Sequence, residues 1–103
     1  MSGLDFDVKE RSRVEDQIKE PPKYKVLLHN DDYTTMDFVV QILEEVFNKT
    51  PSEATAIMLH VHNHGIGVCG VYTAEIAETK IDAVHSRARK AGFPLLATME
   101  RVE

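Results

Sequence analysis

The run 29–37, which reads HNDDYTTMD, constrains the fold most, because it joins two segments of different structure. Residues 24–29 before it are typical of a β-strand whose larger apolar side chains share one face. After it, apolar residues recur at helical spacing through about Asn48, which predicts the clearest amphipathic helix in the chain. A strand that ends on Asn30-Asp31-Asp32 and leads into a helix presents three hydrogen-bond acceptors on a fixed loop.

Two interpretations of this loop follow from its composition. Loops held by rigid elements are where binding residues concentrate, which favours a ligand site. Asn and Asp also form ordinary turns, because their side chains bond the nearby backbone. We expect Thr34 to cap the following helix, with Asp37 three residues later completing a variant capping box. The loop alone does not decide between a ligand site and a turn.

The rest of the chain predicts two more helices and two more strands. Thr50-Pro51-Ser52-Glu53 carries a cap, a proline at the first helical position and a capping-box Glu, and Gly65 ends that helix. Two interior glycines in the following strand indicate a bulge or a close backbone approach. The predicted elements are a helix at 51–64, a strand at 66–72, a helix at 74–91 closed by Gly92, and a strand at 95–101. The order β-α-α-β-α-β favours a two-layer α+β fold, with three strands in one sheet and three helices on one face.

The chain divides into a short N-terminal segment and one domain. At 103 residues with 43 % hydrophobic side chains, it is long enough for one modest core. Residues 1–22 mix charge with sparse apolar positions, and Pro21-Pro22 stops any helix there. We therefore predict a mobile extension at 1–22, either a solvated terminus or an arm that contacts a partner, and a folded domain at 23–103.

Composition argues against several classes of function. Twelve basic and 17 acidic residues give a formal charge of -5, which argues against nucleic-acid binding, because displacing counterions needs a basic face. No signal peptide is visible, and no apolar run approaches the roughly 20 residues that a membrane span needs. The single cysteine, Cys69, cannot form an internal disulfide, which suits a reducing compartment. We expect a cytoplasmic monomer without membrane contact.

Two groups of side chains could be read as reactive centres. His60 and His64 are four residues apart and share a helical face, the spacing of the zinc motif HExxH, but the general-base Glu is missing. A structural zinc site needs four ligands, and Cys69 is the only thiol. Cys69 lies mid-strand among small and apolar residues, which indicates a packed thiol. We predict no metal, no cofactor and no catalytic residue, with a small metalloprotein or thiol enzyme as the alternative.

One constellation of acceptors suits a specific ligand. The carbonyl of Asn30, the carboxylate of Asp31 and a neutral imidazole at His62 all accept hydrogen bonds. Such a set suits a ligand whose polar atoms are all donors, such as a protonated amine. The apolar residues available to hold the neighbouring group are Met36, Val39, Met58, Val61 and Leu95. The physics permits capture of a chain's N-terminus together with its first side chain, although His62 could equally be a satisfied histidine at the edge of the core.

Four ordered motifs resemble the ClpS family of bacterial protease adaptors. They are Asn30-Asp31-Asp32-Tyr33-Thr34-x-Met36, Met58-Leu59-x-Val61-His62, Cys69-Gly70-Val71-Tyr72-Thr73-Ala74-Glu75-x-Ala77-Glu78-Thr79-Lys80 and Pro94-Leu95. The resemblance covers about residues 22–103. It implies an antiparallel three-stranded sheet with three helices. It also implies a non-enzymatic adaptor that hands proteins with an N-terminal Leu, Phe, Tyr or Trp to the ClpA ATPase of the ClpAP protease.

The resemblance implies roles for individual residues as well. The residues that would hold the substrate's α-amino group are Asn30, Asp31 and His62. The side-chain pocket would consist of Thr34, Met36, Val39, Met58, Val61 and Leu95. In that pocket Met36 would be the gatekeeper that rejects β-branched Ile and Val. Glu75 and Lys80 would dock the N-terminal domain of the ATPase, and residues 1–22 would serve substrate delivery.

Two positions depart from the family pattern. Thr35 stands where the family commonly has proline, which loosens the first helical turn and bears on fine specificity. His29 stands where a hydrophobic residue is common, and would either tune a pH response or face water. The alternative function is a docking module that modulates the ATPase's choice of substrates without reading N-termini.

Overall fold

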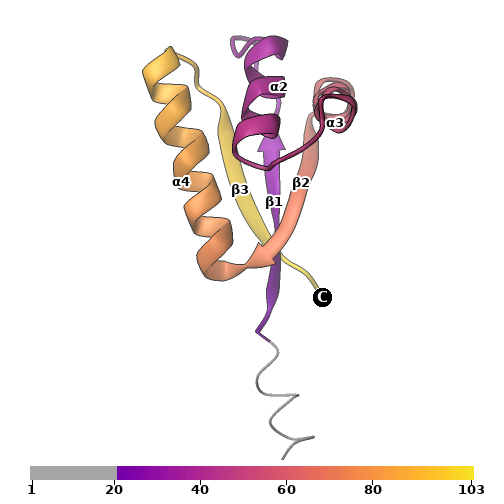
Figure 1. Cartoon of the computed structure of the whole chain (residues 1–103), viewed down its shortest axis with the longest axis vertical. Helices are drawn as coiled ribbons and strands as arrows, with labels where there is room; N and C mark the ends of the chain where they lie inside the picture. The colour runs from indigo at the N-terminus through magenta and orange to yellow at the C-terminus, as the bar shows by residue number, and fades with distance from the viewer. Residues whose placement is uncertain (1–20) are drawn as a thin grey trace, which may run out of the picture.

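Three strands and three helices follow one another in the order β-α-α-β-α-β in the computed structural model, which describes residues 21–103. They are β1 (Lys23–His29), α2 (Met36–Glu45), α3 (Pro51–His64), β2 (Ile66–Thr73), α4 (Ala74–Ala91) and β3 (Leu96–Arg101), as Figure 1 shows. The predicted element order and α+β class are confirmed. Of the extension predicted at 1–22, residues 1–20 lie outside the described residues.

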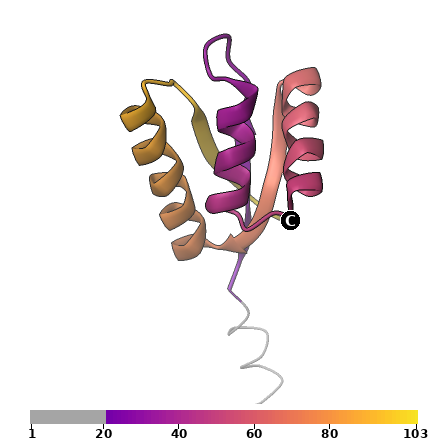
Figure 2. The ribbon, with the colours of Figure 1, turned by 45° about the horizontal axis from the view of Figure 1, so that its top comes forward.

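Strand β1 is the centre of both the sheet and the core. The strand order is β2-β1-β3, and both pairs are antiparallel, as the resemblance implies. All three helices cover one face of the sheet, with α2 between α4 and α3 (Figure 2). Val26 and Leu28 of β1 are fully buried, and they share the core cluster with Ile42 and Leu43 of α2 and Val84 of α4. The helices therefore enclose the core against one side of β1.

Strand β2 carries a bulge and two close approaches, as its interior glycines predict. The register with β1 shifts at Cys69, which has no partner in β1. Tyr72 lies across Gly70 so closely that a Cβ there would overlap its ring. A Cβ on Gly67 would lie 2.7 Å from Val61 Cγ2, so glycine allows α3 to pack directly on β2.

Helix α2 differs from its prediction at both ends. Its N-cap is Thr35, whose side chain accepts the capping hydrogen bond, and not Thr34. The prediction is wrong because the Thr34 hydroxyl is used within the preceding loop, where it donates to Asp31. The helix ends at Glu45 and not near Asn48. Asn48 itself has a φ of 55°, which is incompatible with a continuing helix.

The ends of α3 and α4 follow the local sequence closely. Thr50 Oγ1 accepts from Glu53 N at 3.2 Å, and Glu53 Oε1 accepts from Thr50 N at 2.9 Å, so the predicted capping box is confirmed. Gly65 and Gly92 end the two helices with φ of 87° and 82°, in the left-handed region that favours glycine. Thr73 is the N-cap residue of α4, but its side chain makes no capping hydrogen bond.

Candidate functional site

Four segments meet at one end of the domain. β1 runs toward that end, the loop 30–35 follows it, α2 starts there and α3 finishes there (Figures 1 and 2). The backbone N–H of Asn30 donates to the carbonyl of Gly65 at 2.8 Å, which fixes the loop to the residue that ends α3. This bond holds together two parts of the site that are far apart in sequence.

A pocket of about 240 Å³ lies between these segments. It brings together every residue predicted to bind the ligand except Leu95, and it adds Asp32. The lining residues are Asn30, Asp31, Asp32, Thr34, Met36, Val39, Met58, Val61 and His62. An engineered cavity of about 150 Å³ binds benzene, so this pocket has room for one aromatic side chain.

The apolar part of the pocket has a rigid floor and one exposed side chain. Val39, Met58 and Val61 are at most 8 % exposed and belong to the hydrophobic core. Met36, in the first turn of α2, is 45 % exposed. Leu95 is buried in the same core cluster, but it does not line the pocket. Met36 is therefore the apolar lining residue that can move without disturbing the close-packed core.

Asp31 organises the loop with both of its carboxylate oxygens. Oδ1 accepts hydrogen bonds from the backbone N–H groups of Tyr33 (2.8 Å) and Thr34 (2.7 Å), and Oδ2 accepts one from the Thr34 hydroxyl (2.7 Å). Burial by itself raises the pKa of Asp31, but these hydrogen bonds outweigh it, so the pKa lies below its usual value. A carboxylate has about four lone-pair positions, so Asp31 keeps one position on Oδ2 for a ligand.

Asp32 supplies a carboxylate that sequence reasoning did not assign. It is exposed and lines the pocket. Within residues 21–103 its side chain takes part in no hydrogen bond or ion pair, unlike that of Asp31. The spacing of Asp31 and Thr34, an Asp with a threonine three residues later, is typical of a side chain that bonds its own turn. This spacing could have shown from the sequence that Asp31 bonds its own turn, while Asp32 keeps its carboxylate open.

Asn30 and His62 complete the polar side of the pocket. Both are exposed and line the pocket. Asn30 belongs to the loop and His62 to α3, the two segments that the bond from Asn30 N to Gly65 O holds together. An Asn carbonyl and the free nitrogen of a neutral imidazole accept hydrogen bonds. With the two carboxylates beside them, this side of the pocket favours a cationic donor.

The thiol of Cys69, one of the two possible reactive centres, is buried. Cys69 is 1 % exposed, and burial raises the pKa of its thiol to about 12, so the prediction of a packed thiol is confirmed.

Within the part of the chain that the structure describes, no three His, Cys, Asp or Glu side chains form a group that could hold a metal ion. None of the helices at 21–103 combines the length and apolar character that crossing a bilayer requires.

A second cavity, of about 530 Å³, lies at the opposite end of the domain and is called the α2–α4 groove below. Its lining comes from the end of α2 and from α4, and comprises Glu45, Val46, Glu75, Ile76, Thr79, Lys80, Ala83 and Arg87. Glu75 and Lys80, the two residues predicted to dock the ATPase, both line it. Lys80 Nζ donates to the carbonyl of Val46 at 2.7 Å, and Arg87 forms an ion pair with Glu45, so two contacts link α4 to the end of α2.

The sequence matches one protein family over most of its length. The family model described as ATP-dependent Clp protease adaptor protein ClpS matches residues 19–98. The chain belongs to the ClpS family. A ClpS relative from Nitratidesulfovibrio vulgaris strain Miyazaki F is 64 % identical over 89 residues, which is 86 % of this chain and 89 % of the relative. One from Desulforapulum autotrophicum is 56 % identical over 103 residues, with 98 % of this chain and 99 % of the relative covered.

A solved ClpS structure has the same fold. The structure of Agrobacterium tumefaciens ClpS2 bound to L-phenylalaninamide superposes with a TM-score of 0.78 and 38 % identity. The match covers 81 % of this chain and 100 % of the other. This protein is therefore an adaptor of a Clp protease with the ClpS fold.

Proposed function

We propose that this ClpS-family adaptor binds the free N-terminal residue of proteins that begin with Leu, Phe, Tyr or Trp, and delivers them to the ClpA ATPase of the ClpAP protease. One observation carries the proposal. The pocket has an apolar floor and an acceptor-rich rim, and a relative with the same fold binds L-phenylalaninamide. That ligand joins a Phe side chain to a free α-amino group, with an amide in place of the first peptide bond. It is a minimal N-terminal phenylalanine.

The polar rim binds the amine through the acceptor atoms of its side chains. Asn30, Asp32 and His62 offer open acceptor positions, while Asp31 holds the loop and keeps one position on Oδ2. A protonated α-amine has three N–H donors and can satisfy several of them at once. An acetylated N-terminus or an internal peptide covers the same acceptors without pairing them, at a cost of about 1–3 kcal/mol each. This asymmetry selects free N-termini.

The apolar floor reads the shape of the first side chain. Leu and Phe carry their bulk beyond Cβ, where it enters the space above Val39, Met58 and Val61. Ile and Val are branched at Cβ, which places bulk at the mouth, where Met36 stands. Met36 therefore excludes β-branched residues by steric overlap, while its flexible side chain adapts to aromatic ones.

We propose that the α2–α4 groove docks the N-terminal domain of the ATPase, with Glu75 and Lys80 in the contact. Ile76 lies between them in sequence, lines the same groove and is 49 % exposed, so it offers an apolar surface beside the charges. The pocket and the groove lie at opposite ends of α2, about 15 Å of helix apart. The adaptor can therefore hold a substrate and the ATPase at the same time.

Fluorescence polarisation with four labelled peptides tests the reading of N-termini. The peptides are identical except that they begin with Leu, Phe, Ile or acetyl-Leu. We expect tight binding of the Leu and Phe peptides and weak binding of the other two. Equal binding of all four, or of none, would discard the pocket's role and favour a docking module that does not read N-termini.

Substitution of one acceptor tests the rim. His62→Ala is expected to weaken binding of the Leu peptide at least about tenfold, because one acceptor of the charged amine is lost. Asn63→Ala is the matched control, since Asn63 is exposed on the same turn and does not line the pocket. If both variants bind like the wild type, His62 is a surface histidine only.

A further inference from the structure

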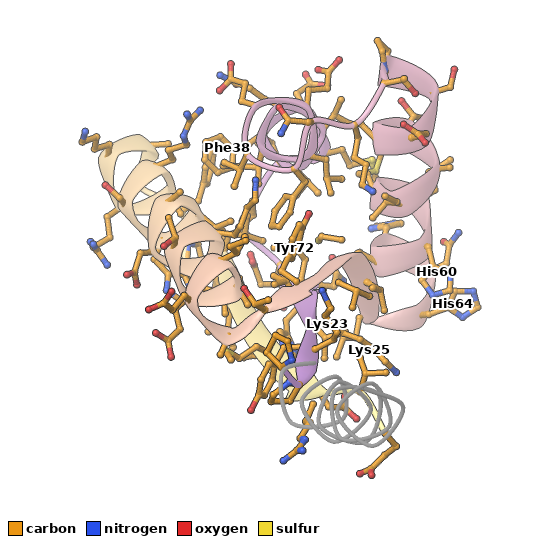
Figure 3. All side chains as sticks on the ribbon, turned by 60° about the horizontal axis from the view of Figure 1, so that its bottom comes forward. Lys23, Lys25, Phe38, His60, His64 and Tyr72 are labelled. Carbon is orange, nitrogen blue, oxygen red and sulfur yellow. The ribbon has the colours of Figure 1, made fainter. Side chains whose placement is uncertain are left out.

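Two exposed histidines near the end of α3 form a pair outside the ligand pocket. His60 and His64 are one helical turn apart, and their ring centroids are 4.4 Å apart. Both side chains are exposed, and Figure 3 shows the two rings side by side on the outer side of α3. Neither lines the pocket, whereas His62 between them does. The pair therefore has no part in the function proposed above.

We propose that His60 and His64 form an open binding site for one divalent transition-metal ion of the zinc, nickel and copper class. The two imidazoles supply two ligands, and water fills the other positions. Imidazole suits these metals, while Mg²⁺ and Ca²⁺ prefer oxygen ligands. The site differs from a structural zinc site, which needs four protein ligands. The sequence predicts no metal at these residues, and the proposal departs from that prediction because an open site needs only two protein ligands.

The spacing of the two rings fits a common metal ion. A zinc–nitrogen bond is about 2.0–2.1 Å, and the ring centre lies roughly 1.1 Å beyond the nitrogen, so each centre is about 3.2 Å from the metal. At angles between about 90° and 109° at the metal, the two ring centres are then about 4.5–5 Å apart. The observed 4.4 Å is close to this range, with an angle of 37° between the ring planes. Both side chains are exposed, so each ring can turn to direct one nitrogen at a shared ion.

A bound ion would clamp the last turn of α3. Helix ends fray because their last carbonyls lack partners within the helix. His60 and His64 span that turn, and Gly65 directly after it accepts the hydrogen bond from Asn30 N (2.8 Å). An ion that bridges the pair therefore stabilises the backbone to which the loop 30–35 is fixed. We expect it to stabilise the fold without contacting the substrate.

The test uses the full chain without a polyhistidine tag. Proton NMR follows the histidine ring signals during titration with Ni²⁺, a paramagnetic ion that broadens signals close to it. We expect selective broadening at His60 and His64 before His29, His62 and His85, and no change with Mg²⁺. Calorimetry with Zn²⁺ should show one site, and His60→Asn or His64→Asn should each weaken it at least about tenfold. Asn63→Ala is the matched control and should bind Zn²⁺ like the wild type.

The thermal midpoint with and without Zn²⁺ gives a second test, which still applies if a histidine variant is less stable than the wild type. The thermal midpoint of the wild type should rise with Zn²⁺ concentration, because the ion binds the folded state. The midpoints of the two histidine variants should not rise. The proposal is wrong if Ni²⁺ broadens the His62 ring first, if Zn²⁺ binds both variants as it binds the wild type, or if no metal binding is detected. Peptide binding by the metal-free protein is independent of each outcome, so these results do not bear on the proposed function.

Discussion

Asp31→Ala tests the different roles assigned to the two adjacent carboxylates. The substitution removes three hydrogen bonds, from the Tyr33 and Thr34 backbone N–H groups and from the Thr34 hydroxyl. It leaves the apolar floor and Asp32 in place. We expect the loop 30–35 to lose order. Affinity for a Leu-initiated peptide then falls, because the peptide binds only the fraction of molecules with an ordered loop.

The expected size of this effect follows from the exposure of the bonded groups. A hydrogen bond to a charged group contributes about 1.5–3 kcal/mol when it is desolvated. Asp31 and Thr34 are only partly buried and Tyr33 is 76 % exposed, so water competes for all three bonds. We therefore take about 2 kcal/mol for the three bonds together. Since 1.36 kcal/mol corresponds to a factor of ten, the peptide should bind up to about thirtyfold more weakly.

Two assays on two variants separate the roles. Fluorescence polarisation measures peptide affinity, and urea unfolding measures the free energy of unfolding. Asp31→Ala should lower both quantities. Asp32→Asn, the matched control, removes a neighbouring charge that makes no bond within the described loop, so it should weaken binding with little change in the free energy of unfolding. The reasoning fails if Asp31→Ala weakens binding while unfolding stays unchanged, because Asp31 would then act only on the amine and not through the order of the loop.

The stabilisation that Asp31 contributes to the fold should depend on pH. The pKa of Asp31 in the folded protein lies below the ordinary value of 3.8, so the folded state binds this proton less readily than the unfolded state. The stabilisation is therefore complete above the unfolded-state pKa and is lost as pH falls through the folded-state pKa. The difference in unfolding free energy between the wild type and Asp31→Asn should be constant near neutral pH and shrink below about pH 4.

Three further substitutions test the pocket gate, the bulge and the groove. Met36→Ala should admit peptides that begin with Ile or Val, measured by fluorescence polarisation; unchanged discrimination would mean that Met36 is no gate. Gly70→Ala should destabilise the fold by about 1–3 kcal/mol, because the new methyl group overlaps the Tyr72 ring, and a wild-type thermal midpoint would contradict this. Lys80→Met should cost about 1 kcal/mol in urea unfolding, because it removes the hydrogen bond to the Val46 carbonyl and the cation above the Tyr72 ring, 5.4 Å from its centroid. Equal unfolding curves would show that neither contact of Lys80 stabilises the fold.

Sequence reasoning succeeded where the determining interactions are local. The capping box of Thr50 and Glu53 and the glycine ends of α3 and α4 depend on residues within one turn, so spacing alone predicts them. It failed at Thr34 because two local interactions compete for the same hydroxyl. The sequence permits an N-cap, but Asp31 already binds that group in the folded loop. Such a competition is decided by the backbone geometry that the strand and helix impose on the loop.

The assembly of the pocket depends on contacts that no local pattern contains. Leu95 was predicted to line the pocket, yet it is buried in the core cluster and does not line the pocket. Asp32 was not assigned, although it keeps an open carboxylate. The bond between Asn30 N and Gly65 O sets the position of Asp32, because it fixes where the loop lies against α3. A bond between residues so far apart in the chain becomes predictable only once the sheet and the helices are placed.

The two proposed sites lie at opposite ends of α2, which predicts that substrate and ATPase bind independently. The first turn of α2 forms the pocket mouth and its last turn borders the groove. Between them, Ile42 and Leu43 are at most 1 % exposed, so the helix cannot shift along its axis without unpacking the core. Docking at one end therefore has no low-energy route by which to close or open the other. The affinity for a Leu peptide should be the same within about twofold with and without a saturating concentration of the N-terminal domain of the ATPase. Allosteric coupling would exceed this, because coupling free energies are about 1–3 kcal/mol and change affinity about fivefold or more. A fivefold change would mean that α2 moves, and that the packing argument is wrong.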